Sequence, residues 1–220
     1  MSGSAGRMSE LDEKKLLGAA YLLQLGKSSF TRVEFEAKTG LDQTTSENSL
    51  RQLIEIGLLQ QTDNEYSLQL HGRSKLKVVL TGGVYDILHV GHLAALVEAK
   101  SLGDILVVVV ATDITVETLK GRRPVFPEED RRTIVNSLKP VDAAILGYED
   151  VGMGYEQVIE DVRPDVIALG YDQDLLFRTF SELVRRKGLN FEIVRLPKFD
   201  KEKYPSSSAI RQRVLREPEQ

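Results

Sequence analysis

The sequence predicts an α/β protein in which a doubly wound parallel sheet follows a small α+β domain. After about residue 76, short continuous apolar runs alternate with helical segments, which is typical of a parallel sheet covered by helices on both faces. Before that point, helical periodicity comes first and two short strand-like runs follow. We therefore expect a disordered lead at residues 1–10, the small domain with a linker at 11–75, and the large domain at 76–220.

The composition is that of an ordinary globular chain and excludes several classes of protein. Of 220 residues, 41% are hydrophobic and none is Cys, which excludes a disulfide scaffold, a thiolate nucleophile, a Cys-based zinc site and an iron–sulfur cluster. No apolar run reaches the ~18 residues of a membrane helix, and the first ten residues have no apolar signal core, so we expect a cytoplasmic protein with no membrane partner. A net charge of −4 argues against a broadly basic nucleic-acid binder.

In the small domain we expect three helices and a two-stranded ribbon. Gly residues follow each helical stretch, as they often do where helices end. Thr44-x-x-Glu47 predicts a capping box at the start of the third helix. The expected elements are helices over 16–25, 31–38 and 44–57, strands over 58–61 and 66–70, and a linker over 71–75.

This order of elements resembles that of a winged helix-turn-helix domain over residues 11–72. In a DNA-binding version the third helix would enter the major groove. Here that helix offers polar side chains with a single cation, Arg51, which is too little charge to neutralise phosphates. We therefore do not expect DNA as a partner, and we expect the domain to serve packing, dimerisation or regulation.

In the large domain the apolar runs and the helical segments follow one another in strict alternation. Ligands of such sheets bind beyond the carboxyl ends of the strands, so functional residues are expected there. The expected strands are 78–80, 105–111, 143–146, 166–169 and 191–196, and the expected helices are 92–102, 127–138, 155–162, 175–187 and 206–215.

The most informative stretch runs from Thr81 to His92, directly after the first of these strands. Gly82 and Gly83 allow a sharp turn and a close approach of the backbone to a ligand. His89 and His92 are three residues apart and share a face of the first helical turn, where they can donate hydrogen bonds to charge that develops on a transferring phosphate. The alternatives are packing or metal binding, but a metal site would need a third ligand, and the one other histidine, His71, belongs to the other domain.

These residues resemble the nucleotidylyltransferase superfamily. The run Gly83-Val84-Tyr85-Asp86-Ile87-Leu88-His89-Val90-Gly91-His92 is similar to the superfamily pattern G-x-F-D-x-x-H-x-G-H, with Tyr in place of Phe. Three further stretches match in the same order: Lys120–Pro124 followed by Glu129-Asp130-Arg131, then Gly170–Gln173, then Ser206–Arg211. The resemblance covers about residues 76–216 and implies a Rossmann-like fold.

The resemblance implies a reaction in which a nucleoside triphosphate and a phosphorylated acceptor give a nucleotide-linked product and pyrophosphate. The implied catalytic residues are His89, His92 and Lys120. Mg²⁺ is implied as the cofactor, held mainly by substrate phosphates and water rather than by protein ligands. The implied acceptor-binding residues are Asp86, Lys120 and Arg131, and the implied nucleotide-binding residues are Thr81, Gly82, Gly83, Val84, Tyr85, His89, Gly91, His92, Gly170, Asp172, Ser206, Ser207, Ser208 and Arg211.

Each of these motifs also has a purely structural interpretation. A basic loop such as Lys120–Arg123 is often only solvated, and a Ser triplet is often a linker or a helix cap. Gly170–Gln173 is also compatible with a plain turn at the end of a strand. Arg131 has two possible roles, phosphate binding or tying the fold together, and Tyr85 has an alternative place in the core.

Within the superfamily, the archaeal FAD synthase-like branch has the most similar pattern, including Lys139–Asp142 and Ile145–Gly147. That branch implies transfer of AMP from ATP to FMN. The alternative is a CTP-dependent cytidylyltransferase that acts on glycerol phosphate or a related polyol or amino-alcohol phosphate. Because Pro205–Ser208 differs from the R-T-x-G-I-S-T element of those enzymes, we expect ATP. An alternative of another class is a nucleotide-sensing DNA-binding regulator. We expect a homodimer.

Overall fold

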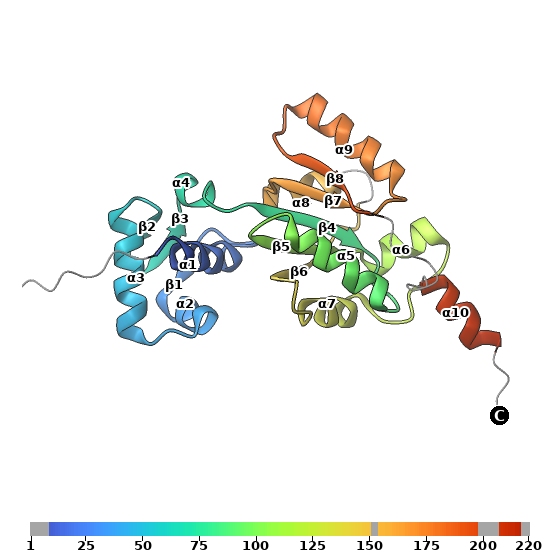
Figure 1. Ribbon diagram of the computed structural model, residues 1–220, viewed down its shortest axis with the longest axis horizontal. Coiled ribbons are helices and arrows are strands. Elements are labelled where there is room, and N and C mark those ends of the chain that lie inside the picture. Colours follow the sequence, from blue (N-terminus) through green and yellow to red (C-terminus); the bar gives the residue numbers. More distant parts are fainter. Residues whose placement is uncertain (1–8, 151–153, 198–206, 217–220) are drawn as a thin grey trace, which may run out of the picture. The chain divides into compact units, whose positions relative to one another are not determined.

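The computed structural model describes residues 9–150, 154–197 and 207–216 (Figure 1). The chain divides into two compact units, Met1–Leu76 and Lys77–Gln220, and each is described by itself. In the described part of the chain, every helix is too short or too polar to cross a membrane.

The N-terminal unit packs three helices against a small antiparallel sheet. Its core is formed by fully buried side chains that include Leu17, Phe30, Phe35 and Leu53, and the rings of the two Phe residues stack with centroids 5.8 Å apart. The sheet has the strand order β1-β3-β2. The elements are α1 (Glu10–Leu23), β1 (Phe30–Thr31), α2 (Arg32–Thr39), α3 (Gln43–Glu55), β2 (Leu59–Thr62), β3 (Glu65–Leu68) and α4 (Leu70–Arg73).

Two expectations for this unit are wrong: its sheet has three strands rather than two, because Phe30–Thr31 pair with β3, and the predicted cap of its third helix is misplaced. The cap of α3 is Asp42, whose carboxylate accepts the backbone N–H of Thr45 at 3.1 Å, so Thr44 lies inside the helix and cannot cap it. A reciprocal capping box is present instead at the start of α2, between Thr31 and Glu34.

The segment expected as a linker starts with an ordered helical turn, α4. Gly72 is packed so closely that a Cβ atom there would lie 2.4 Å from the carbonyl oxygen of Leu58. The guanidinium of Arg73 lies over the ring of Tyr21, 5.3 Å from its centroid. These contacts attach α4 to the body of the unit.

The second unit confirms the predicted fold class. Its five strands are all parallel and have the order β6-β5-β4-β7-β8, so the chain moves outward from β4 in one direction and then returns to build β7 and β8 on the other side. Helices cover both faces of the sheet (Figure 1). The elements are β4 (Val78–Gly83), α5 (Val90–Ser101), β5 (Ile105–Val110), α6 (Asp113–Lys120), α7 (Glu128–Asn136), β6 (Ala143–Leu146), α8 (Gly154–Val162), β7 (Val166–Leu169), α9 (Asp174–Lys187), β8 (Glu192–Arg195) and α10 (Ser207–Arg216).

The two ends of the central strands differ in chemistry. At the amino ends, Asp104 accepts the backbone N–H of Lys77 at 2.8 Å, and Asp165 accepts that of Val78 at 2.7 Å. These carboxylates satisfy the first donors of β4 and close that edge of the sheet. At the carboxyl ends, β4 and β7 are neighbours whose connections leave in opposite directions, which is the position where ligands bind in sheets of this kind.

Candidate active site

The site begins where β4 ends, next to β7. The hydroxyl of Thr81 donates to the carbonyl of Ala168 at 2.8 Å, which fastens the two strands to each other at this edge. Gly82 and Gly83 continue β4 and pair with Val109 and Val110 of β5, so the strand is longer than expected. The hydroxyl of Thr81 is therefore occupied within the sheet, whereas Gly82 and Gly83 can offer a ligand only backbone groups.

Tyr85 turns the chain from β4 toward α5 in a conformation that few side chains adopt. Its φ angle is +52°, in the left-handed region, and it is only 7% exposed. A Cβ atom on Gly83 would lie 3.0 Å from the Tyr85 ring. The ring can occupy this position because residue 83 has no side chain. Burial raises the pKa of Tyr85, which keeps the phenol neutral. Such a constrained residue fixes the direction in which the next residues leave the sheet.

His89 caps the helix that carries the second histidine. It precedes α5 with an extended backbone, and its Nδ1 accepts the N–H of Gly91 at 3.1 Å. Because Nδ1 is an acceptor, the proton of the neutral ring resides on Nε2. Burial lowers the pKa of His89. The helix cap therefore leaves His89 with one N–H donor for a ligand.

His92 lies against His89 and is more deeply enclosed. The two imidazole rings stack with centroids 3.9 Å apart, and the ring of Tyr85 is 5.3 Å from that of His92. Burial, with the nearby charges of His89 and Lys120, lowers the pKa of His92 to about 4. Within the described residues, its Nδ1 is buried and has no hydrogen-bond partner. A buried polar atom without a partner is costly, so this nitrogen is available for a ligand.

Asp86 gathers the cations of the site. Its carboxylate is 7% exposed and forms ion pairs with Arg211 of α10 and with Arg122, the latter at 3.5 Å. Burial lowers the pKa of Lys120, the charges of Arg122 and Arg211 lower it further, and Asp86 raises it. Lys120, Arg122 and Arg211 are called the cation cluster below. Three cations held this close together favour a polyanionic ligand.

The C-terminal helix also reaches the turn after β4. The hydroxyl of Ser207 donates to the carbonyl of Ile87 at 3.0 Å, which places the start of α10 beside the histidine motif. Ser206 and the side chain of Ser208 lie outside the described residues. Of the predicted serine motif, the structure therefore brings Ser207 and Arg211 to the site.

Arg131 does not occupy the position expected of an acceptor-binding residue. Its side chain has no exposed surface, and its three guanidinium nitrogens donate to the carbonyls of Phe126 and Val84 and to Asp113, at 2.9, 2.6 and 2.6 Å respectively. A guanidinium enclosed in this way cannot touch a substrate in this conformation. Arg131 therefore ties the fold together, which is the second of the two roles considered for it.

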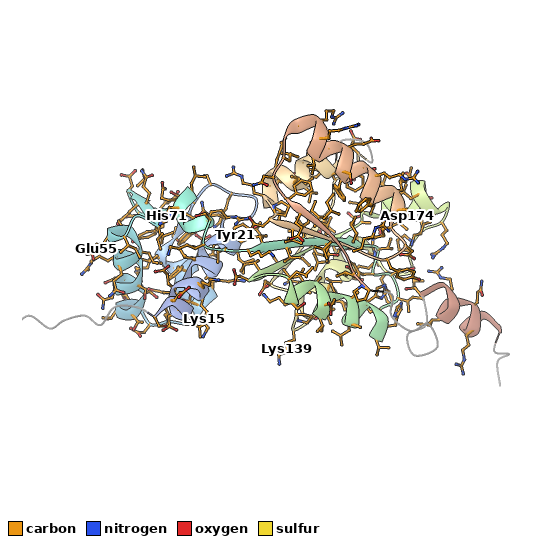
Figure 2. The ribbon with its side chains drawn as sticks, turned by 45° about the horizontal axis from the view of Figure 1, so that its top comes forward. Lys15, Tyr21, Glu55, His71, Lys139 and Asp174 are labelled. Atoms are coloured by element: carbon orange, nitrogen blue, oxygen red, sulfur yellow. The ribbon has the colours of Figure 1, made fainter. Side chains whose placement is uncertain are left out.

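The predicted Gly170 motif forms the rim of the site after β7. The N–H of Gly170 donates to Oε1 of Gln173 at 2.7 Å, while Asp172 is exposed. Arg195, at the end of β8, pairs with Asp174 at 2.7 Å and lies over the ring of Phe177, 4.4 Å from its centroid. Figure 2 labels Asp174 at the start of α9. Arg195 therefore braces this rim, and neither it nor Arg122 was selected from the sequence.

Arg122 and Arg195 differ in whether the sequence contained a usable signal. Arg122 lies inside the recognised basic loop and could have been selected with Lys120. Arg195 lies at the end of an ordinary apolar strand, and only the sheet order brings it near Asp174.

Among the residues that the structure describes, the site contains no group of three or more His, Asp or Glu side chains able to hold a metal ion. Its donors are imidazole, ammonium and guanidinium nitrogens, which suit phosphate oxygens. The one enclosed carboxylate, Asp86, is already paired with two arginines. These residues fit a cation that arrives bound to the substrate phosphates rather than one held by side chains.

Fold and site together define a nucleotidyltransferase: paired histidines and a cation cluster at the carboxyl edge of a doubly wound parallel sheet. Residues 80–213 match the Cytidylyltransferase-like family, and the chain belongs to that family. This confirms the resemblance found in the sequence.

Comparison with individual proteins shows which kind of nucleotidyltransferase the chain resembles. The chain is 45% identical over 143 residues to the FAD synthase of Pyrococcus abyssi, a match that covers 65% of this chain and 95% of that protein. It is 50% identical over 121 residues to the FAD synthase of Aciduliprofundum boonei, covering 55% and 78%. A solved structure, the lipopolysaccharide core biosynthesis protein from Thermoplasma volcanium, is 42% identical with a TM-score of 0.52, covering 57% and 99%. The chain is thus a nucleotidyltransferase similar to archaeal FAD synthases.

Proposed function

We propose that this nucleotidyltransferase transfers AMP from ATP to FMN and releases pyrophosphate. The observation that carries the proposal is the stacked His89–His92 pair at the start of α5, in a chain 45% identical to a FAD synthase over 95% of that protein. The fold forms the site, and the similarity to FAD synthases is the reason for choosing FMN as the acceptor.

The reaction is one in-line displacement. An oxygen of the FMN phosphate forms a bond to the α-phosphorus of ATP, while the bond from that phosphorus to the oxygen shared with the β-phosphorus breaks. The electron pair of the broken bond leaves with pyrophosphate. Such a step requires positioning and charge stabilisation rather than a protein nucleophile.

The histidines stabilise charge as neutral donors. Nε2–H of His89 is the donor that the cap at Gly91 leaves available. His92 remains neutral at physiological pH because its pKa is lowered to about 4, so one of its nitrogens carries a proton to donate. Two fixed donors near the α- and β-phosphates stabilise the transition state without rearrangement of water.

The cation cluster neutralises the triphosphate and its leaving group. The negative charge of Asp86 favours the protonated form of Lys120. The ion pairs of Asp86 with Arg122 and Arg211 also keep the loop after α6 beside the start of α10. Mg²⁺ bound to the phosphates supplies further neutralisation of their charge. Removing divalent cations with a chelator should abolish turnover.

The base and ribose of ATP are assigned to the rim after β7. The exposed Asp172 can accept hydrogen bonds from a ribose or an amino group. Backbone at Gly82, Gly83, Val84 and Gly91 lines the side toward the phosphates. Recognition of a base edge by such groups is worth about 1–3 kcal/mol for each hydrogen bond that a wrong base leaves unpaired.

The direct test is product formation. The full chain is incubated with Mg²⁺ and either ATP with FMN or CTP with glycerol phosphate, and the products are separated by chromatography. We expect FAD and pyrophosphate from the first pair only. Turnover of the second pair alone would move the assignment to a polyol-phosphate cytidylyltransferase.

For the N-terminal unit we propose a winged-helix-like packing or regulatory module that does not bind DNA. α3, the helix that would enter a major groove, carries a single cation, Arg51. Two other cations of the unit are paired, Lys27 with Glu34 and Arg32 with Glu36 and, at 3.7 Å, with Glu47. This leaves little charge to neutralise phosphates. A duplex-binding assay at two salt concentrations should detect no binding, and salt-sensitive binding would instead favour the nucleotide-sensing regulator.

We also propose that the protein is a homodimer. Val90, Leu93 and Val97 share one face of α5 and are 56%, 42% and 54% exposed, a stripe that a second copy would cover. Light scattering after size exclusion should give the mass of two chains.

A further inference from the structure

Two apolar side chains are displayed on a backbone that is held by buried charges. Val125 and Phe126, between α6 and α7, are 54% and 43% exposed. Asp86 accepts the N–H of Val125 at 2.5 Å and that of Phe126 at 3.3 Å. Nε of Arg131 donates to the carbonyl of Phe126 at 2.9 Å. Both polar groups of the Phe126 backbone are thus fixed.

Buried charges hold the backbone of this exposed apolar pair. In the described part of the chain, Asp86 and Arg131 are the charged residues that are buried, and both are directed to the backbone of Phe126. Burying a charge is costly unless it is well paired. A single exposed apolar residue is ordinary on a protein surface. Two adjacent apolar residues on a backbone fixed by buried charges indicate a functional role. The arrangement presents an ordered apolar surface rather than a loose loop.

The surface is joined to the cation cluster through one carboxylate. Oδ1 of Asp86 takes the two backbone N–H groups, while Oδ2 pairs with Arg211 and, at 3.5 Å, with Arg122. The apolar pair and the phosphate-binding cations are therefore positioned by the same side chain. A ligand that covers both must combine a phosphate with a substantial apolar part.

We propose that Val125 and Phe126 form a platform for the flat ring system of the acceptor, whose phosphate lies toward the cation cluster. This inference rests on the proposed function and names the residues that select the acceptor. An aromatic ring stacks on a Phe side chain and is stabilised by both dispersion and removal of apolar surface from water. A polyol phosphate has no ring to place there, so the platform favours FMN over glycerol phosphate.

The test compares Phe126→Ala and Phe126→Leu with Ile134→Ala in the full chain. Ile134 is a matched control because it lies on α7 and is 42% exposed. Titration calorimetry with FMN and with ATP gives the two dissociation constants for each variant. We expect Phe126→Ala to weaken FMN binding about tenfold and Phe126→Leu about threefold, with ATP binding within about twofold of wild type. Ile134→Ala should leave both ligands unaffected.

Any other result overturns either the platform or the proposed function. Unchanged FMN affinity in folded Phe126→Ala overturns the platform, and so does an equal loss of FMN and ATP affinity, which would show that the loop only supports the site. A change from dimer to monomer with FMN affinity retained would show that the surface is an interface between copies. If wild type makes FAD but the variants behave like wild type, only the platform fails; if wild type neither binds FMN nor makes FAD, the proposed function fails.

Discussion

At the scale of single residues, the site depends on side chains whose ordinary properties are changed by their neighbours. His89 is fixed in one tautomer by the N–H of Gly91, and His92 is kept neutral by burial. The sequence predicted that the two histidines lie together at the start of a helix, as they do, because a strand, a glycine turn and a helix start are local signals. It did not predict that Asp86 and Arg131 are buried, because charged side chains are usually exposed and their partners are distant in the chain.

Replacing either His89 or His92 by Ala should lower kcat by about 10²-fold or more, because each removes a donor from the transition state. His71→Ala is the matched control, since His71 is exposed on α4 in the other unit (Figure 2). Steady-state kinetics with ATP and FMN, with circular dichroism to show an intact fold, provide the measurement. Wild-type turnover in a folded double variant would exclude the mechanism.

Stability should depend on pH through His92. Its pKa is about 4 in the folded protein and 6.5 as a free side chain, so the unfolded chain takes up a proton first as the pH falls. The stabilisation is therefore complete above 6.5 and is lost as the pH falls toward 4. Denaturant unfolding at about pH 7 and about pH 5 should show a smaller decrease for His92→Gln than for wild type. An equal decrease in both proteins would contradict this assignment.

At the scale of secondary structure, continuous apolar runs gave the most accurate predictions. The strands over 143–146 and 166–169 were predicted with their observed bounds. Helix α6 was missed although Thr112 caps it and Gly121, at φ +64°, ends it, because it is only eight residues long and four of them are β-branched Ile, Thr and Val, which have low helix propensity. β4 was predicted too short, since only pairing with β5 shows that Gly82 and Gly83 continue the strand.

The corrected start of α3 can be tested by two neighbouring substitutions. Asp42→Ala removes the carboxylate that accepts the N–H of Thr45 and should lower the denaturant midpoint clearly, as loss of a helix N-cap does. Thr44→Ala is the control and should change the free energy of unfolding by a few tenths of a kcal/mol, roughly the scale of helix propensities. Chemical denaturation measures both, and the reverse order of effects would restore Thr44 as the cap.

At the scale of the whole molecule, the described residues of the site all belong to the second unit. A fragment of residues 76–220 should therefore bind ATP within about threefold of the full chain, as titration calorimetry can show. A fragment that is folded but does not bind ATP would indicate that the N-terminal unit contributes to the site or to its assembly. The sequence located the change of pattern between the units, but it could not give the function of the first one, because residues 11–72 carry no diagnostic side chain.

The histidine pair is proposed to promote transfer of the adenylyl group of ATP to FMN. The most direct measurement uses ATP labelled with ³²P at the α-position, together with FMN and Mg²⁺, and follows the label by chromatography. We expect the label to appear in FAD and pyrophosphate to be unlabelled, with the rate in the His89→Ala/His92→Ala double variant reduced at least about 10²-fold. Label retained in ADP or AMP with unmodified FMN, or an undiminished rate in the folded double variant, would contradict it.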